Sequence, residues 1–297
     1  MTFPNFLIIG AAKSGTTALY HGLKQHPDVY MSPVKEPRYF APEFYWTNYD
    51  APLRDSRRKQ PMTLEAYTDL FEAAGQAKAI GEASTEYLYF PETPQRIKTQ
   101  IPKVKLVAVL RNPVERAFSA YCYQMRDGCA VLPFEEAIEA EPKRIKQNWR
   151  PGWLYLKSGD YLPQLERYYR TFDSSQIKVY LYDELRRQPQ RLYRDLFSFL
   201  EVDPTFEPEL AQKNVSKMPA SQSLNRLKRR LKVVKPAIEA LLPETLVERM
   251  SAKLDELNMR DKPELNQELR ETLSEHFSDD VMELQDLIGK DLSLWLN

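Results

Sequence analysis

Short apolar runs in the first two thirds of the chain predict buried β-strands. Residues 6–10, 105–110 and 177–182 are dominated by aliphatic and aromatic side chains, without the regular polar alternation of a half-exposed strand. Runs of this kind are typical of strands that are covered on both faces. A weaker run at residues 29–32 ends at Pro33 and predicts a further strand.

Helical patterns separate these runs. Leu19 and Leu23 lie four residues apart, as on one face of a helix. Pro113 suits the first turn of a helix, where its missing N–H costs nothing. Helices are therefore expected over residues 16–26, from Pro113 to about Gln124, and from Asp183 through Leu192, Leu196 and Phe199.

The alternation of strands and helices predicts the fold class. It indicates an α/β three-layer fold, like that of P-loop proteins, in which helices cover both faces of a central parallel sheet. One domain over residues 1–297 is expected. Residues 219–297 are predicted to be mainly a helical C-terminal addition, with an apolar end at residues 291–296 that docks on the body.

Residues 41–63 break this regularity. They are rich in aromatic, proline and charged residues and show no periodicity, as in a surface loop or lid. Phe40, Phe44, Tyr45, Trp46 and Tyr49 could cover a substrate, or they could anchor the loop to the core. The sequence leaves both possibilities open.

Composition excludes several classes of protein. The chain has 42 basic and 42 acidic residues and thus no net charge, which argues against a nucleic-acid partner. Two cysteines cannot form a disulfide framework, and three histidines without a Cys/His cluster argue against a structural zinc site. No signal peptide is visible, and no apolar stretch approaches the ~20 residues that span a membrane. A cytoplasmic protein is expected.

The first strand leads into a loop with the outline of a phosphate-binding motif. Gly10-Ala-Ala-Lys-Ser-Gly-Thr-Thr has the spacing G-x-x-x-x-G, followed by a predicted helix whose N-terminal N–H groups favour an anion. A nucleotide triphosphatase needs Lys and then Ser or Thr directly after the second glycine. Here Thr16 and Thr17 follow Gly15, and the lysine lies earlier, at Lys13. The loop therefore predicts phosphate binding without an obvious magnesium ligand.

A second anion site is predicted after the strand at residues 105–110. Arg111 follows this strand directly, where ligands bind in parallel sheets. Ser119 lies about two helical turns further along and could face the same ligand. Alternatively, Arg111 pairs with a carboxylate and Ser119 faces solvent.

Together these motifs resemble those of sulfotransferases that use 3′-phosphoadenosine 5′-phosphosulfate (PAPS). Lys13-Ser-Gly-Thr-Thr-Ala-Leu resembles their 5′-phosphosulfate loop, and Leu110-Arg-Asn-Pro-Val-Glu-Arg-Ala-Phe-Ser resembles their 3′-phosphate motif. Gly81-Glu-Ala-Ser-Thr-Glu-Tyr-Leu is also similar to a segment of this family. The resemblance implies a PAPS donor, no metal, and donor contacts from Lys13, Ser14, Gly15, Thr16, Thr17, Ala18, Arg111 and Ser119.

Residues 32–40 point to the carbohydrate branch of this family, which includes heparan sulfate sulfotransferases and bacterial relatives. In that branch a Lys-Glu pair after the second strand carries the general base, which implies this role for Glu36. Lys13 would stabilise the departing phosphate oxygen. Arg38 stands where many heparan enzymes have histidine, a departure that concerns the acceptor. Glu36 could instead be a surface carboxylate paired with Lys35 or Arg38.

The acceptor is not fixed by the sequence. A hydroxyl on a small molecule, a glycan, or a polyketide or lipid bound to a carrier protein is compatible with the resemblance. Residues 226–235 carry a basic run that could dock an acidic carrier protein, or could be the solvated side of a helix: Arg226, Lys228, Arg229, Arg230, Lys232 and Lys235. The alternative functions are a P-loop small-molecule kinase and a non-catalytic sensor of the desulfonated product PAP.

Overall fold

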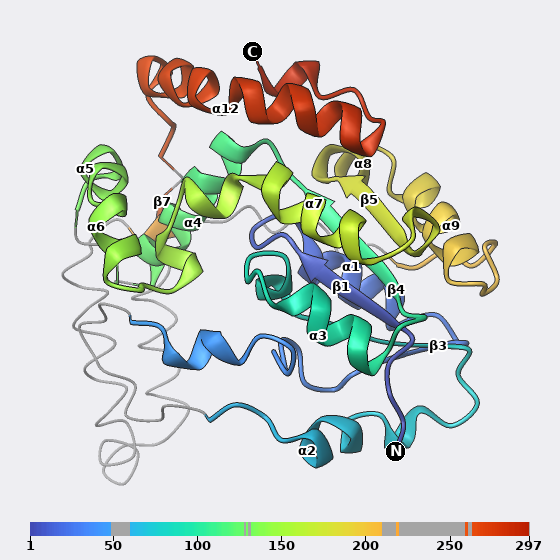
Figure 1. Cartoon of the computed structure of the whole chain (residues 1–297). Coiled ribbons are helices and arrows are strands. Elements are labelled where there is room, and N and C mark those ends of the chain that lie inside the picture. The colour runs from blue at the N-terminus through green and yellow to red at the C-terminus, as the bar shows by residue number, and fades with distance from the viewer. Residues whose placement is uncertain are drawn as a thin grey trace, which may run out of the picture.

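A five-stranded parallel sheet forms the centre of the molecule (Figure 1). The computed structural model describes residues 1–48, 60–127, 129, 132–209, 218–219, 259–260 and 263–296. The strands follow the order β2-β3-β1-β4-β5. Their bounds are β1 Phe6–Gly10, β2 Val29–Met31, β3 Ala79–Ala83, β4 Lys105–Leu110 and β5 Ile177–Leu181.

Both faces of the sheet are buried, as the continuous apolar runs predict. Leu7 and Ile9 of β1 point into one hydrophobic core, whereas Phe6 and Ile8 point into a second core on the opposite face. All four side chains are fully buried. The strand therefore holds the two helical layers together through alternate residues.

The helices divide between these two cores. Helices α2, α3, α4, α7 and α12 contribute buried side chains to the core of Leu7, and α1, α8 and α9 contribute to that of Phe6. Their bounds are α1 Thr16–Leu23, α2 Leu64–Asp69, α3 Thr93–Gln100, α4 Pro113–Arg126, α5 Phe134–Glu139, α6 Glu141–Lys146, α7 Tyr161–Thr171, α8 Tyr182–Arg187, α9 Pro189–Phe199 and α12 Gln267–Ile288. The three-layer α/β prediction is confirmed.

Three-residue or five-residue 3₁₀ turns connect several of these elements: η1 Pro42–Trp46, η2 Glu72–Ala74, η3 Thr85–Tyr87, η4 Pro151–Trp153, η5 Lys157–Gly159, η6 Ser174–Gln176 and η7 Ser293–Trp295. A small antiparallel pair joins β6 Met218–Pro219 to β7 Met259–Arg260. The loop predicted over residues 41–63 begins with η1 and ends at Thr63, which caps α2 through its side chain.

The secondary structure departs from the predicted elements in several places. The sequence patterns did not identify β3, an inner strand between β1 and β2, nor the helices α2, α3, α5, α6 and α7. The helix expected from Asp183 is two helices, because Pro189 disfavours a helical conformation at Gln188, where α8 gives way to α9. The first helix also ends three residues earlier than expected, at Leu23.

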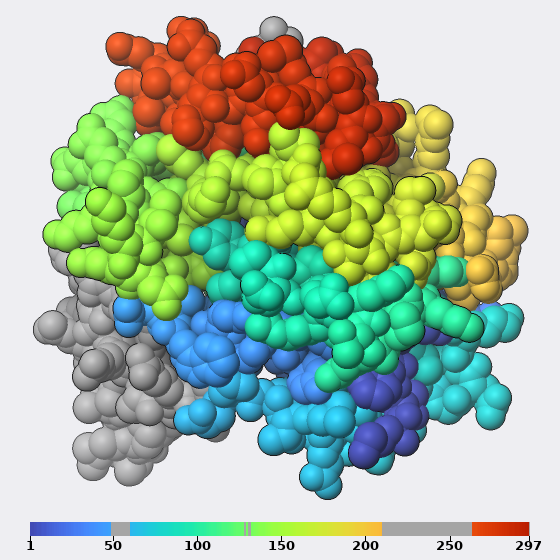
Figure 2. Space-filling model, viewed as in Figure 1, coloured from blue at the N-terminus to red at the C-terminus, as the bar shows by residue number. Residues whose placement is uncertain are grey.

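The predicted docking of the C-terminal end is confirmed. Leu292 and Trp295 are buried in the larger core, and Figure 2 shows the orange-to-red segment of α12, which precedes them, lying against the yellow-green segment of α7. The basic run at residues 226–235 and the aromatic Tyr49 lie outside the described residues. Their predicted roles stay predictions.

Candidate active site

The loop between β1 and α1 is built to expose backbone N–H groups. Gly15 precedes α1 with φ of 90°, a conformation that favours glycine. A Cβ there would lie 2.9 Å from Cδ2 of Leu185, which is closer than real contacts allow. No side chain caps the first turn of α1, so its N–H groups remain available to an anion.

The second predicted anion site lies beside this loop. The guanidinium of Arg111 donates to the carbonyl of Lys13 over 3.4 Å and pairs with Glu115 at 3.2 Å. It also lies over the ring of Tyr182, with 4.8 Å to the ring centroid. The sequence leaves pairing of Arg111 with a carboxylate open as an alternative to an anion site. This pairing exists, with Glu115, and Arg111 nevertheless lies beside the loop between β1 and α1.

All five strands of the sheet deliver residues to one cavity of about 860 Å³ at their carboxyl ends. Ligands of parallel α/β sheets bind at this edge. Among the predicted residues, the cavity is lined by Lys13, Gly15, Thr16, Thr17, Glu36, Arg111 and Ser119. Ser14 and Ala18 are not among the lining residues; Ser14 is fully buried near Tyr161.

Another hollow, of about 450 Å³, lies along β5 and the end of α12 and contains none of the predicted site residues. Its charged side chains are largely paired with one another, as in Lys178 with Asp195 and Lys290 with Glu184. The larger cavity is therefore the candidate active site.

The charge of the cavity is strongly positive. Six basic and two acidic side chains are found among the described residues that line it: Lys13, Lys35, Arg38, Arg111, Arg116 and Arg150 against Glu36 and Glu86. A concave surface of one sign attracts ligands of the opposite sign. The cavity therefore suits a polyanion, although the whole chain has no net charge.

Lys13 lies at the centre of this positive field. Burial lowers the pKa of its ammonium to about 8, and the nearby Arg126 and Arg111 act in the same direction. The ammonium rests over the ring of Tyr123, 4.2 Å from the ring centroid. A lysine in this state is close to losing its proton near neutral pH, and an anionic ligand would restore its preference for the charged form.

The turn that carries Glu36 is fixed to the end of β3. The N–H of Glu36 donates to the carbonyl of Ala83 over 2.9 Å, and the N–H of Arg38 donates to Oγ of Ser84 over 3.0 Å. Glu36 and Arg38 have φ of 61° and 56°, which costs a non-glycine residue on the order of 1–3 kcal/mol each. The hydrogen bonds to β3 hold the turn in this conformation.

Behind this turn lies a fully buried carboxyl group, Glu82. It accepts hydrogen bonds from Oγ of Ser84 at 2.9 Å and from the hydroxyl of Tyr67 at 3.3 Å. Burial raises the pKa of Glu82 to about 7, and the hydroxyls of Tyr87, Ser84 and Tyr67 oppose that shift. Ser84 therefore connects Glu82 to the backbone of Arg38.

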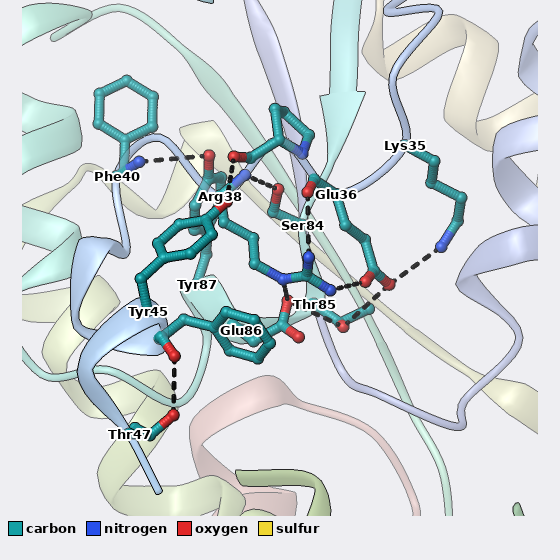
Figure 3. Close-up of polar contacts among 12 residues, drawn as sticks. Lys35, Glu36, Arg38, Phe40, Tyr45, Thr47, Ser84, Thr85, Glu86 and Tyr87 are labelled. Atoms are coloured by element: carbon teal, nitrogen blue, oxygen red, sulfur yellow. Dashed lines mark hydrogen bonds and ion pairs between the residues drawn. The ribbon is translucent and has the colours of Figure 1, made fainter. Parts of the chain in front are cut away.

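Both carboxylate oxygens of Glu36 are engaged (Figure 3). Oε1 accepts from the ammonium of Lys35 at 3.1 Å and from the hydroxyl of Thr85 at 3.4 Å, and Oε2 pairs with the guanidinium of Arg38. The pairing of Glu36 with Lys35 or Arg38 that the sequence suggested is present with both residues. Glu36 is nevertheless not on the outer surface, because it lines the cavity.

The wall opposite the phosphate loop is aromatic and cationic. Phe44 lines the cavity between two guanidinium groups, at 4.2 Å from Arg38 and 4.6 Å from Arg150. Trp153, also lining, is nearly fully buried, whereas Trp46 outside the lining is largely exposed. Phe40 thus anchors this segment to the core, whereas Phe44 lines the cavity.

Sequence reasoning assigned no role to Glu86, Tyr123 or Arg150. The position of Thr85 and Glu86 directly after a strand would have identified them, but β3 was not predicted. Tyr123 lies four residues after Ser119 on α4, and this spacing would have placed both on one side of the helix. Arg150 comes from an irregular connection and carried no local signal.

In the described ranges of the chain, no group of three or more His, Cys, Asp and Glu side chains is arranged to hold a metal ion. No helix in the part of the chain that the structure describes is both long and apolar enough to cross a membrane.

The three-layer α/β fold, with the loop after β1, Arg111 after β4 and Glu36 after β2 at one cavity, is similar to that of sulfotransferases. Residues 3–285 match the sulfotransferase domain family, and the chain belongs to it.

Individual relatives agree with this assignment. The crystal structure of a sulfotransferase from Alicyclobacillus acidocaldarius is 32% identical, covers 100% of both chains and has a TM-score of 0.79. A sulfotransferase domain from the curacin biosynthetic pathway, 16% identical over 71% of this chain and 78% of its own, shares the fold with a TM-score of 0.50. The bifunctional heparan sulfate N-deacetylase/N-sulfotransferase 4 of Mus musculus is 30% identical over 69% of this chain, which spans 24% of that protein.

Proposed function

We propose that this protein transfers a sulfuryl group from PAPS to a hydroxyl acceptor. The observation that carries the proposal is the convergence of Lys13, Arg111 and Glu36 on one positively charged cavity at the carboxyl edge of the sheet. Membership of the sulfotransferase family supports the reaction class. The donor, the acceptor and the roles of single residues are our inference.

The donor fits the two anion sites. Its 5′-phosphosulfate would take the N–H groups and hydroxyls of the loop at residues 13–18, and its 3′-phosphate would take Arg111 and Ser119. Arg111 has a planar guanidinium that suits a phosphate, and its salt bridge to Glu115 is exchangeable because both side chains are partly exposed. A nucleotide with phosphate groups at both ends would satisfy both places.

The chemistry is an in-line displacement at sulfur. As the acceptor oxygen forms its bond to sulfur, the acceptor O–H gives its proton to Glu36. The bond between sulfur and the bridging phosphate oxygen breaks, and its electron pair leaves with PAP. Lys13 stabilises the charge that grows on this oxygen, an interaction that strengthens in the transition state.

The acceptor class is proposed at the level of a hydroxyl compound. The names of the heparan sulfate N-sulfotransferase relatives favour a glycan, although they denote transfer to nitrogen and so do not themselves support a hydroxyl. The aromatic wall of Phe44 and Trp153 is compatible with a sugar or lipid face. Docking of an acidic carrier protein at residues 226–235 remains a prediction from sequence, since that run lies outside the described residues.

The two alternatives differ in what they bind. A small-molecule kinase would prefer ATP with Mg²⁺, and Thr16 in place of the usual P-loop lysine speaks against it. A PAP sensor would bind the product nucleotide without turnover. Calorimetric titration with PAP, against ATP plus Mg²⁺, separates the kinase from the other two: we expect tight, metal-independent binding of PAP, and preference for ATP–Mg²⁺ would overturn the proposal.

Substitution of Glu36 separates the enzyme from the sensor. We expect Glu36→Gln to keep PAP affinity and to lower sulfation of a hydroxyl panel by about 10²–10⁴-fold, the usual contribution of a general base. Arg111→Ala is expected to remove the preference for a 3′-phosphorylated nucleotide. Equal binding of PAP and AMP by the unsubstituted protein would contradict the placement of this second site.

A further inference from the structure

The side of the cavity that carries Glu36 holds a chain of ion pairs among Glu36, Arg38 and Glu86, of which the proposed reaction uses only Glu36. Arg38 stands at its centre, between Glu36 on one side and Glu86 on the other (Figure 3). Nε of Arg38 lies 2.9 Å from Oε2 of Glu86, and a terminal nitrogen of the same guanidinium pairs with Oε2 of Glu36. One cation thus serves two carboxylates.

Several contacts hold the central Arg38 of this ion-pair chain in place. Arg38 is held through its backbone N–H by Ser84, through Nη1 by the carbonyl of Glu36 at 3.3 Å, and through its flat face by Phe44. Only 19% of its side chain and 13% of that of Glu86 are exposed. A guanidinium fixed at this many points determines where its carboxylate partners can lie.

The two carboxylates differ in what else they contact. The hydroxyl of Thr85 lies 3.4 Å from an oxygen of each, but only Glu36 also contacts Lys35, and Glu86, from η3, is the more deeply buried. Burial raises the pKa of Glu86, and the charge of Arg38 opposes that shift. Burial works to lower the pKa of Arg38, but both carboxylates outweigh it, so that its pKa is raised.

We propose that Arg38 and Glu86 form a positioning pair for the Glu36 carboxylate. Arg38 fixes the orientation of Glu36, and Glu86 takes part of the charge of Arg38, so that Glu36 can accept a proton without leaving a buried guanidinium unpaired. This inference rests on the proposed role of Glu36 as the base.

The charge balance explains why a second carboxylate is needed. With Glu36 as its sole partner, Arg38 would hold that carboxylate firmly in its ionised form, and a base held in this way accepts protons poorly. When the acceptor proton arrives, Glu36 becomes neutral and its pairing with Arg38 weakens. Glu86 then keeps the guanidinium in place for the next turnover, because an uncompensated buried charge is strongly destabilising.

Other charged or titratable groups also face Glu36. Lys35 comes from the same turn, Glu82 from β3 and Tyr123 from α4, and each interacts electrostatically with Glu36 or contacts it. These groups are unchanged in variants of Arg38 and Glu86. Differences between such variants therefore report on the pair.

The test follows the ionisation of Glu36 directly and needs no acceptor. The protein is labelled with ¹³C at the Glu side-chain carboxyl carbons, and the Glu36 signal is assigned by its loss in Glu36→Gln. We expect Glu86→Gln to move the midpoint of the Glu36 titration to lower pH by about one unit and Arg38→Gln to move it to higher pH by about as much. Glu86→Asp, which keeps the charge, should restore most of the original midpoint.

A matched control uses a second arginine–glutamate pair. Glu43 and Arg96 lie 2.5 Å apart, and neither lines the cavity. Glu43→Gln is expected to leave the Glu36 midpoint unchanged. A Glu86→Gln midpoint that does not move, or a shift of the same size in Glu43→Gln, would overturn the proposal, and both can be measured even if Arg38→Gln fails to fold.

Failure of the positioning pair and failure of the proposed function give different results. If PAP binds and Glu36→Gln abolishes sulfation while the Glu36 midpoint is indifferent to Glu86, the pair is wrong and the function stands. If the midpoint shifts as expected but PAP does not bind, the pair controls the ionisation of Glu36, and its proposed role in sulfuryl transfer is wrong. With an acceptor from the hydroxyl panel, Glu86→Gln should lower kcat and leave PAP affinity within about twofold.

Discussion

At the scale of single residues, the site is a balance between cations and the few groups that restrain them. Lys13 lies on the ring of Tyr123, Arg111 on the ring of Tyr182, and Arg38 on the ring of Phe44. An aromatic face attracts a cation without neutralising it, so each ring orients its cation and leaves the charge available to a ligand or a carboxylate. Carboxylates pair with two of these cations: Glu36 and Glu86 with Arg38, and Glu115 with Arg111.

The lowered pKa of Lys13 has a consequence for pH. Because burial lowers the pKa of the ammonium to about 8, Lys13 is charged below that pH and loses its charge above it. An anionic nucleotide interacts with the charged form, so PAP affinity is expected to change little around pH 7 and to fall up to tenfold per pH unit above about pH 8. Calorimetric titration across this range measures the effect.

Lys13→Arg supplies the control for this pH dependence. Arginine keeps its charge throughout the range, so affinity should vary less with pH in this variant. An identical decline in Lys13→Arg would assign the dependence to another group. Proton uptake on binding, measured near pH 8 in buffers of different ionisation enthalpy, should also disappear in the variant.

At the scale of elements, the strands that could be predicted were those with uninterrupted apolar runs. β1, β4 and β5 are recognisable because burial on both faces requires apolar residues at successive positions. β3 is equally buried, yet it contains Gly81 and Glu82. A Cβ at Gly81 would lie 2.2 Å from the ring of Phe6, and the buried Glu82 accepts hydrogen bonds from the hydroxyls of Ser84 and Tyr67, so the sequence of β3 reflects tertiary contacts.

The candidate site was predictable to the same extent. The motifs at Lys13 and Arg111 follow recognisable strands, and their residue types and positions are enough to predict two anion sites, whereas the PAPS donor followed from the resemblance to the family. The ion-pair chain of Arg38 was not predictable, since Glu86 lies after the strand that was missed and the two residues are 48 positions apart. Which carboxylate pairs with which arginine depends on the register of β2 and β3.

The phosphate loop depends on the left-handed conformation of Gly15. Gly15→Ala places a Cβ against Leu185 and Tyr182 and adds backbone strain of about 1–3 kcal/mol. We expect this variant to lose PAP affinity by more than tenfold and to unfold at a lower temperature. Calorimetry with PAP and thermal denaturation measure the two effects separately.

Gly75 offers a matched comparison. It also has positive φ, at 56°, but nothing lies within 4 Å of the position that a Cβ would take. Gly75→Ala should therefore cost some stability and leave PAP affinity unchanged. Equal loss of affinity in the two variants would mean that the effect at Gly15 is global destabilisation.

At the scale of the whole molecule, the C-terminal segment completes the core beneath the second anion site. Trp295 is 4% exposed and packs near Tyr161, which donates to the carbonyl of Arg111 over 3.0 Å. The carbonyl of Trp295 also accepts from the side chain of Asn112 at the start of α4. The last helix and turn thus support the backbone that presents Arg111.

Truncation of Trp295 tests this support. We expect Trp295→Ala to lower the free energy of unfolding by about 3–5 kcal/mol, as loss of a buried tryptophan usually does. Its neighbour Leu294 is 70% exposed, and Leu294→Ala should change stability by less than about 0.5 kcal/mol. Denaturant titrations of both variants make the comparison, and similar losses would argue against specific docking of Trp295.

Two ion pairs of Glu115 connect the site to helix α12. Glu115 pairs with Arg111 at 3.2 Å and with Arg270 of α12 at 2.5 Å. A phosphate that takes Arg111 removes one of the partners of Glu115, and we expect the ion pair between Glu115 and Arg270 to strengthen as a result. If nucleotide binding and this ion pair are coupled by a given factor, loss of the ion pair weakens nucleotide binding by the same factor. The backbone amides of α12 should therefore exchange more slowly with deuterium when PAP is bound, and Arg270→Ala should abolish that difference. Hydrogen exchange of α12 would then report whether the nucleotide site is filled.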